Sequence, residues 1–82
     1  MKGIVKSVNH KNGLVAVQLE NGEYSIFEPL GGYDIEIGDV ISGEIDFDGG
    51  INAFNHSKNE SLDIMVEYSG LAQNQVREIF AR

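Results

Sequence analysis

The chain has 82 residues and a net charge of −7, with 6 Lys and Arg against 13 Asp and Glu. This length fits one domain, because a compact domain typically has about 100 to 150 residues. The absence of cysteine excludes disulfides, thiolate metal sites and a cysteine nucleophile. The acidic balance disfavours a polyanion as the main partner, because phosphates are bound by clustered Lys and Arg.

No segment has the roughly 18 consecutive apolar residues that would span a bilayer. Residues 1–20 carry scattered lysines among single apolar residues and show no secretory signal pattern. We therefore expect a cytoplasmic protein that makes no contact with a membrane.

Glycine-containing turn pairs divide the first 57 residues into short β-rich segments. These pairs, Asn12-Gly13, Asn21-Gly22 and Gly49-Gly50, suit two-residue hairpin loops because Gly and Asn tolerate a positive φ. The predicted strands are residues 2–9, 14–20, 23–30, 40–47 and 51–57. Five short strands at hairpin spacing predict a small antiparallel sheet or barrel.

The second predicted strand alternates most clearly. Val15, Val17 and Leu19 share one face, and Leu14 and Ala16 lie on the other. The first set is expected to face the core and the second to face outward.

In the fourth predicted strand, residues 40–47, the apolar side chains of Ile41, Ile45 and Phe47 share one face. Gly43 lies in the middle of that strand, where a glycine predicts a bulge or a sharp bend. Such a bend helps a short sheet to close on itself.

The pattern changes after residue 57. Residues 62–68 alternate as a sixth amphipathic strand, and apolar residues then recur at helical spacing. The apolar stripe of this helix is Leu71, Val76, Ile79 and Phe80. Because an isolated helix of roughly 11 residues is marginal in water, the stripe must dock. It docks either across an open face of the barrel or on a partner, which would be a second copy of the chain or another protein.

Three segments between residues 1 and 45 carry a family resemblance. Residues 2–6 (Lys-Gly-Ile-Val-Lys) lead through the turn at residues 9–13 into residues 14–17, which look like a first ribonucleoprotein motif. Residues 23–27 fall where the second such motif would be, and residues 38–45 are similar to a fourth strand that opens with glycine. In these segments the chain resembles a cold-shock domain.

The resemblance covers residues 1–57. It implies a mainly β fold, a five-stranded antiparallel Greek-key barrel of the oligonucleotide/oligosaccharide-binding (OB) type. In such barrels the face formed by strands two and three commonly binds the ligand. Residues 58–82 then form a C-terminal extension, a strand and a short helix packed on the same single domain.

The resemblance also implies where nucleic-acid bases would stack. The matching positions are Leu14, Ala16, Ser25 and Phe27, of which Phe27 alone is aromatic. If the register were one residue different, Phe27 would be buried and Tyr24 exposed with Ile26. The candidate nucleic-acid-binding residues are Lys2, Lys6, Lys11, Leu14 and Phe27.

Charge is unevenly distributed along the chain. Residues 1–19 hold three lysines and no acid, whereas residues 20–48 hold nine acids and no Lys or Arg. The acids lack the ligand spacing of a calcium loop, so no metal site is expected. A phosphate-binding glycine loop, a nucleophile elbow and a His-Glu-x-x-His pair are also missing, which predicts a protein that is not an enzyme and uses no cofactor.

Two functions remain after these exclusions. The first is a non-enzymatic OB-fold module that binds single-stranded RNA or DNA weakly. The alternative is an acidic protein-interaction or self-association module that has lost cold-shock-type binding and contacts its partner through the helix stripe, Leu71, Val76, Ile79 and Phe80.

Overall fold

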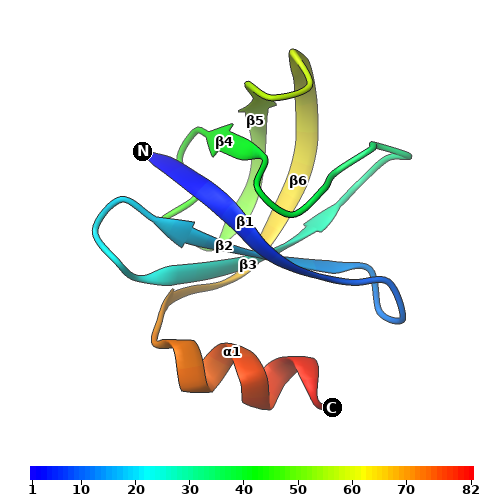
Figure 1. Cartoon of the computed structure of the whole chain (residues 1–82). Coiled ribbons are helices and arrows are strands. Elements are labelled where there is room, and N and C mark those ends of the chain that lie inside the picture. The colour runs from blue at the N-terminus through cyan, green and yellow to red at the C-terminus, as the bar shows by residue number, and fades with distance from the viewer.

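The computed structural model describes all 82 residues as six strands and one helix. In chain order these are β1 (Lys2–Asn9), β2 (Leu14–Leu19), β3 (Tyr24–Pro29), β4 (Val40–Ser42), β5 (Gly49–Asn55), β6 (Glu60–Leu71) and α1 (Gln73–Phe80). The strands are antiparallel and close into a barrel in the order β1-β2-β3-β6-β5-β4, with α1 packed outside it (Figure 1). The predicted fold class is confirmed: the chain is mainly β, and its barrel is consistent with a small OB type.

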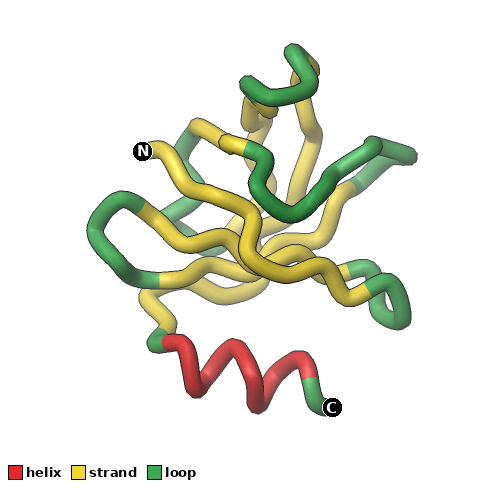
Figure 2. The backbone as a smooth tube through the Cα atoms, in the orientation of Figure 1, coloured by secondary structure: helices red, strands yellow, loops and turns green.

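The barrel closes through its last strand. β1, β2 and β3 form a meander, and the connection after β3 carries the chain to the far edge of β1, where β4 pairs. β6 then pairs with β5 on one side and with β3 on the other. Figure 2 shows the loops gathered at the ends of this ring of strands. β6 is therefore an integral strand of a six-stranded barrel, and residue 57 does not mark a break in the sheet.

Because successive side chains of a strand point to opposite faces, every second residue faces the inside of the barrel, and the apolar residues occupy these inner positions. As predicted, Val15, Val17 and Leu19 lie in the core, at 3% exposure or less. The remaining buried members of this cluster are Val5, Phe27, Ile41, Ile45, Ala53, Leu62, Ile64 and Val66. Burial of these side chains is the main stabilising contribution in a domain without disulfides.

The fourth strand is shorter than its sequence pattern predicts. β4 ends at Ser42 because Gly43 adopts φ +141°, a conformation that L side chains rarely take, and the chain bends away from the ladder. The predicted bend is thus confirmed, but the predicted shared face is only partly right. Ile41 and Ile45 are buried, whereas Phe47, beyond the bend, is 66% exposed.

The helix packs on the outer face of β2 and β3. Val76 and Ile79 are buried against Ala16 and Ile26, and together these four residues form a second apolar cluster. The Nδ2 of Asn9 donates a hydrogen bond of 3.2 Å to the carbonyl of Phe80, which ties the end of α1 to the end of β1. The apolar stripe of the helix is therefore buried against the barrel of the same chain.

A buried carboxylate joins the β3–β4 connection to the turn between β5 and β6. Asp39 accepts hydrogen bonds from Asn55 Nδ2 at 2.9 Å, from the Glu36 N–H at 3.0 Å and from Lys58 Nζ at 2.9 Å. Burial by itself would raise the pKa of Asp39, but these donors outweigh it and lower that pKa below its ordinary value. Lys58 also pairs with Glu36 at 2.7 Å, and the two carboxylates raise the pKa of Lys58.

Candidate nucleic-acid interface

The face that the resemblance assigns to ligand is covered. Ala16 is fully buried beneath α1, and Leu14 is half-buried against the same apolar cluster. The prediction that Leu14 and Ala16 face outward from the sheet is correct, yet neither offers a free surface. Leu14 is therefore not available as a base-stacking position, because the helix occupies that side of β2.

The assignment of Phe27 to a stacking role is wrong. Its side chain is fully buried inside the barrel, opposite Val15. Ser25 also faces inward and is fully buried. Tyr24 lies on the outer face with Ile26, because β3 pairs with β2 in the register that sets Ser25 and Phe27 opposite the core residues Val17 and Val15.

The helix residues assigned to a partner are used within the chain. Val76 is 7% exposed and Ile79 is 8% exposed, and Leu71 and Phe80 pack on the same cluster. The physical reason is that the outer face of β2 and β3 is itself apolar at Ala16 and Ile26, so packing of the stripe against it buries both apolar surfaces. The stripe therefore packs on the barrel of its own chain, and its docking on a partner stays a prediction.

A different face of the barrel is open. On β1, Lys2, Ile4 and Lys6 point outward, as the alternating burial of this strand shows, while Gly3 and Val5 point inward. Lys2 and Lys6 therefore share one face of β1. Ile4 is 44% exposed, which leaves an apolar side chain between the two cations.

The open face continues onto β4 and β5. Lys2 pairs with Ser42, and Ser42 pairs with Phe54, so these three side chains form one row across neighbouring strands. The row spans two strand spacings, roughly 10 Å from Lys2 to Phe54. We define the open face as Lys2, Ile4, Lys6, Val40, Ser42, Phe54 and His56.

Two rings of the open face are held by contacts within it. The ring of Phe54 meets that of His56 edge-on, with centroids 4.9 Å apart. His56 Nε2 is 2.8 Å from Ser42 Oγ, and the His56 N–H donates to the Val40 carbonyl at 2.8 Å. Residue His56 is therefore held by a side-chain and a backbone hydrogen bond, and the Phe54 ring packs against its ring.

The open face carries no carboxylate. Glu20, which directly follows β2, lies beside it, and its Oε1 accepts a hydrogen bond from the Lys2 N–H at 2.9 Å. Glu20 therefore lies at the border of the open face. In a chain with thirteen acids, a sheet face with two lysines, a histidine and a phenylalanine has a composition that matches the stacking and phosphate contacts of single-stranded nucleic acid.

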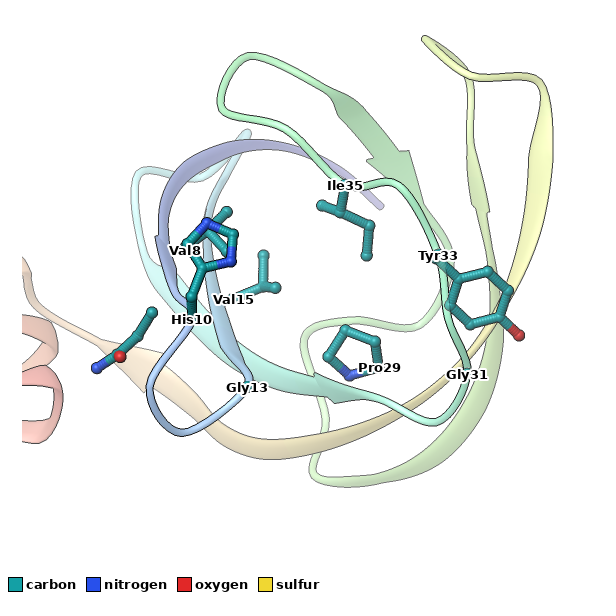
Figure 3. Close-up of a pocket in the computed structure, with 9 residues that line it drawn as sticks. Val8, His10, Gly13, Val15, Pro29, Gly31, Tyr33 and Ile35 are labelled. Atoms are coloured by element: carbon teal, nitrogen blue, oxygen red, sulfur yellow. The ribbon is translucent and has the colours of Figure 1, made fainter.

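Lys11 is not part of the open face. It lies in the β1–β2 turn, at the other end of β1 from Lys2. That end of the barrel holds a cavity of about 230 Å³, into which Val15, Pro29 and Ile35 point, whereas Tyr33 points away from it (Figure 3). The Tyr33 hydroxyl instead accepts a hydrogen bond from the Asp63 N–H at 3.0 Å. The cavity is smaller than the roughly 300 to 1,000 Å³ of ordinary ligand pockets.

Phe54 and His56 are the residues that sequence reasoning missed. The strand 51–57 was predicted, but its faces were not assigned. The signal was present: Ala53 and Asn55 alternate with Phe54 and His56, and a small residue and an amide at the inner positions leave the two rings outside.

No cluster of three or more His, Asp or Glu side chains is arranged to hold a metal ion. No helix has the length and apolar character required to cross a membrane.

Comparison of the chain with known protein families, with curated proteins and with solved structures finds no match. The class defined by the fold is a closed six-stranded antiparallel barrel, compatible with an OB-like barrel.

Proposed function

We propose that this protein is a non-enzymatic binding module for single-stranded nucleic acid, and that the strand lies on the open face rather than on β2 and β3. The observation that carries the proposal is the row Lys2–Ser42–Phe54, which aligns a cation, a hydroxyl and an aromatic ring on an uncovered sheet face. The proposal keeps the function expected of an OB-type barrel and changes the surface that performs it.

Each side chain of the row has a defined role. Phe54 provides a ring on which a base stacks, worth about 1 to 3 kcal/mol. Lys2 and Lys6 lie on β1, two strands away from Phe54, where they neutralise phosphates. His56 and Ser42 offer hydrogen-bonding groups to base edges, and the bond between them fixes both side chains.

The charge of the chain limits the affinity. With two lysines in contact with phosphates, the slope of log K against log salt is roughly −1.4 for a single strand. A fourfold rise in salt then weakens binding roughly sevenfold. The thirteen acids elsewhere repel the rest of the strand, so only a short segment is held.

Fluorescence anisotropy with a short labelled oligonucleotide at low salt tests the proposal. Phe54→Ala is expected to weaken binding at least fivefold, which corresponds to the loss of about 1 kcal/mol of stacking. Phe47→Ala is the matched control, because it removes an exposed phenylalanine on the loop after β4. Equal affinities of the two variants would contradict the proposal.

A second pair of variants separates the charge contribution from that of the ring. Lys2→Gln is expected to weaken binding and to make the salt slope shallower by about 0.7. Lys11→Gln removes the same charge from the β1–β2 turn and is expected to leave both unchanged. Because Lys2 is exposed, this variant does not depend on the packing of Phe54, and its thermal unfolding reports that it is folded.

One observation favours the acidic protein-interaction function as a second candidate. Phe47 is 66% exposed between Asp46 and Asp48, an apolar anchor flanked by negative charge. This combination suits a basic peptide segment. A titration with a lysine-rich peptide should shift the resonances of Phe47 and its neighbours, and an unchanged spectrum would exclude this mode.

A further inference from the structure

A second polar surface lies on the other side of β1, where α1 leaves part of the barrel uncovered. A groove of about 360 Å³ runs between the outer face of the sheet and the helix. Its lining residues are Lys6, Ser7, Ala16, Gln18, Tyr24, Gln73, Val76 and Arg77. Its volume falls within the range of ordinary small-molecule pockets.

Both charged residues of the groove are cations. Lys6 comes from β1 and Arg77 from α1, and the groove has no carboxylate. Neither side chain makes an ion pair or a hydrogen bond within the chain, since the ion pairs of the structure belong to Lys58. In a chain of net charge −7, two unpaired cations that converge on one groove mark a site for an anion.

Local backbone geometry places Lys6 at the groove. The pairing of β1 with β2 shifts between Val5 and Ser7, so Lys6 has no partner on β2. A bulge of this kind re-aims the extra side chain and bends its strand. Lys6 therefore stands where the open face and the groove meet, and Ser7 follows it into the groove.

The rest of the lining is suited to a planar, hydrogen-bonding group. Tyr24 contributes an aromatic ring, and Ala16 and Val76 contribute an apolar floor. Gln18 and Gln73 contribute amides, each with donors and an acceptor, and neither amide is used in a hydrogen bond within the chain. An anion alone would not require the ring or the amides.

We infer that this groove binds a phosphomonoester attached to a nucleobase, with the phosphate on Lys6 and Arg77 and the base beside Tyr24. A terminal phosphomonoester carries close to two negative charges at neutral pH, which matches the two cations. Arg77 offers a bidentate contact to phosphate oxygens. The ligand is either a free nucleoside monophosphate or the phosphorylated end of a strand, and both present the same chemistry.

Calorimetric titration with adenosine monophosphate, adenosine and inorganic phosphate tests the inference. The monophosphate is expected to bind at least tenfold more tightly than either adenosine or phosphate alone. Equal binding of monophosphate and adenosine would overturn the phosphate contact, and equal binding of monophosphate and inorganic phosphate would overturn the base contact.

Variants locate the binding in the groove. Arg77→Gln is expected to weaken monophosphate binding at least tenfold, whereas Arg82→Gln removes the same charge beyond the end of α1 and should have no effect. Lys6→Gln removes the other cation of the groove, on β1, and is also expected to weaken monophosphate binding. If Arg77→Gln and Arg82→Gln bind equally, the site is not this groove.

Two further arms separate the ligand sources and the two sites. Hexanucleotides with and without a terminal phosphate, titrated into Phe54→Ala to weaken binding on the open face, distinguish a strand end from a free nucleotide. A preference for the phosphorylated strand over both the unphosphorylated strand and the monophosphate identifies the strand end, and a preference for the monophosphate identifies the free nucleotide. Phe54→Ala should leave monophosphate binding unchanged. Failure of strand binding on the open face therefore does not remove the groove, and failure of the groove does not remove the open face.

Discussion

Replacement of Ile79 by alanine tests whether α1 is held to the barrel by its apolar stripe. Ile79 is 8% exposed and packs in the cluster with Ala16, Ile26 and Val76. Truncation of a large buried aliphatic side chain to alanine costs about 2 to 5 kcal/mol, and a small cluster at the surface places the loss near about 2 kcal/mol. A domain of this size has a free energy of unfolding of roughly 4 to 12 kcal/mol, so the loss is a large fraction of it.

Thermal and chemical denaturation of Ile79→Ala measure this loss. For a domain of 60 to 100 residues, each kcal/mol lowers Tm by about 4 to 8 °C, so Tm is expected to fall by roughly 8 to 16 °C. Glu78→Ala is the control, because Glu78 is the exposed neighbour on the same helix. If the two variants agree within about 0.5 kcal/mol, α1 does not stabilise the barrel and the face of β2 and β3 is not covered in solution.

Three other variants test the interior and the loops. Ser25→Ala removes a fully buried hydroxyl whose Oγ has no hydrogen-bond partner, so the free energy of unfolding should rise by about 1 kcal/mol, and a loss in chemical denaturation would show that the hydroxyl is satisfied. Asp39→Asn removes a carboxylate whose pKa is lower in the folded state than its ordinary value of 3.8. The ionised carboxylate therefore stabilises the fold fully above pH 3.8, and this stabilisation is lost as the pH falls through the lower pKa of the folded state. The stability difference between wild type and Asp39→Asn should therefore be largest near neutral pH and shrink in acid, and a difference that is constant with pH would contradict the ion-pair account. Gly43→Ala introduces a Cβ at φ +141° and 3.4 Å from the Cα of Ala53, so we expect the free energy of unfolding, measured by denaturation, to fall by about 1 to 3 kcal/mol. An unchanged free energy of unfolding would contradict strain at this bend.

The part of the fold that could be predicted from the sequence follows from local rules. Gly13 and Gly22 take the positive φ that their turn pairs predict, and the alternation of β2 places its apolar side chains in the core. Strand spacing and turn chemistry depend on neighbours in the sequence. They therefore predicted the class of the fold and most of the strand positions.

The site was not predictable in the same way, because it depends on pairing between distant strands. Phe27 faces inward because β3 pairs with β2 in the register that sets Phe27 opposite Val15, and a shift of one residue would reverse that face. The amphipathic pattern of α1 predicts that its stripe is covered but does not specify the covering surface. Phe54 joins Lys2 only through Ser42, because β1 pairs with β4, a strand far from it in the sequence, and β4 pairs with β5.

Chemical-shift mapping with a short single-stranded oligonucleotide at low salt shows directly which face of the barrel binds nucleic acid. With an oligonucleotide that has no terminal phosphate, shifts are expected at Lys2, Ser42, Phe54 and His56 and should diminish as salt rises, while the amide of Ala16, beneath α1, stays unchanged. Shifts confined to β2 and β3, or no shifts at low salt, would contradict the assignment of nucleic-acid binding to the open face.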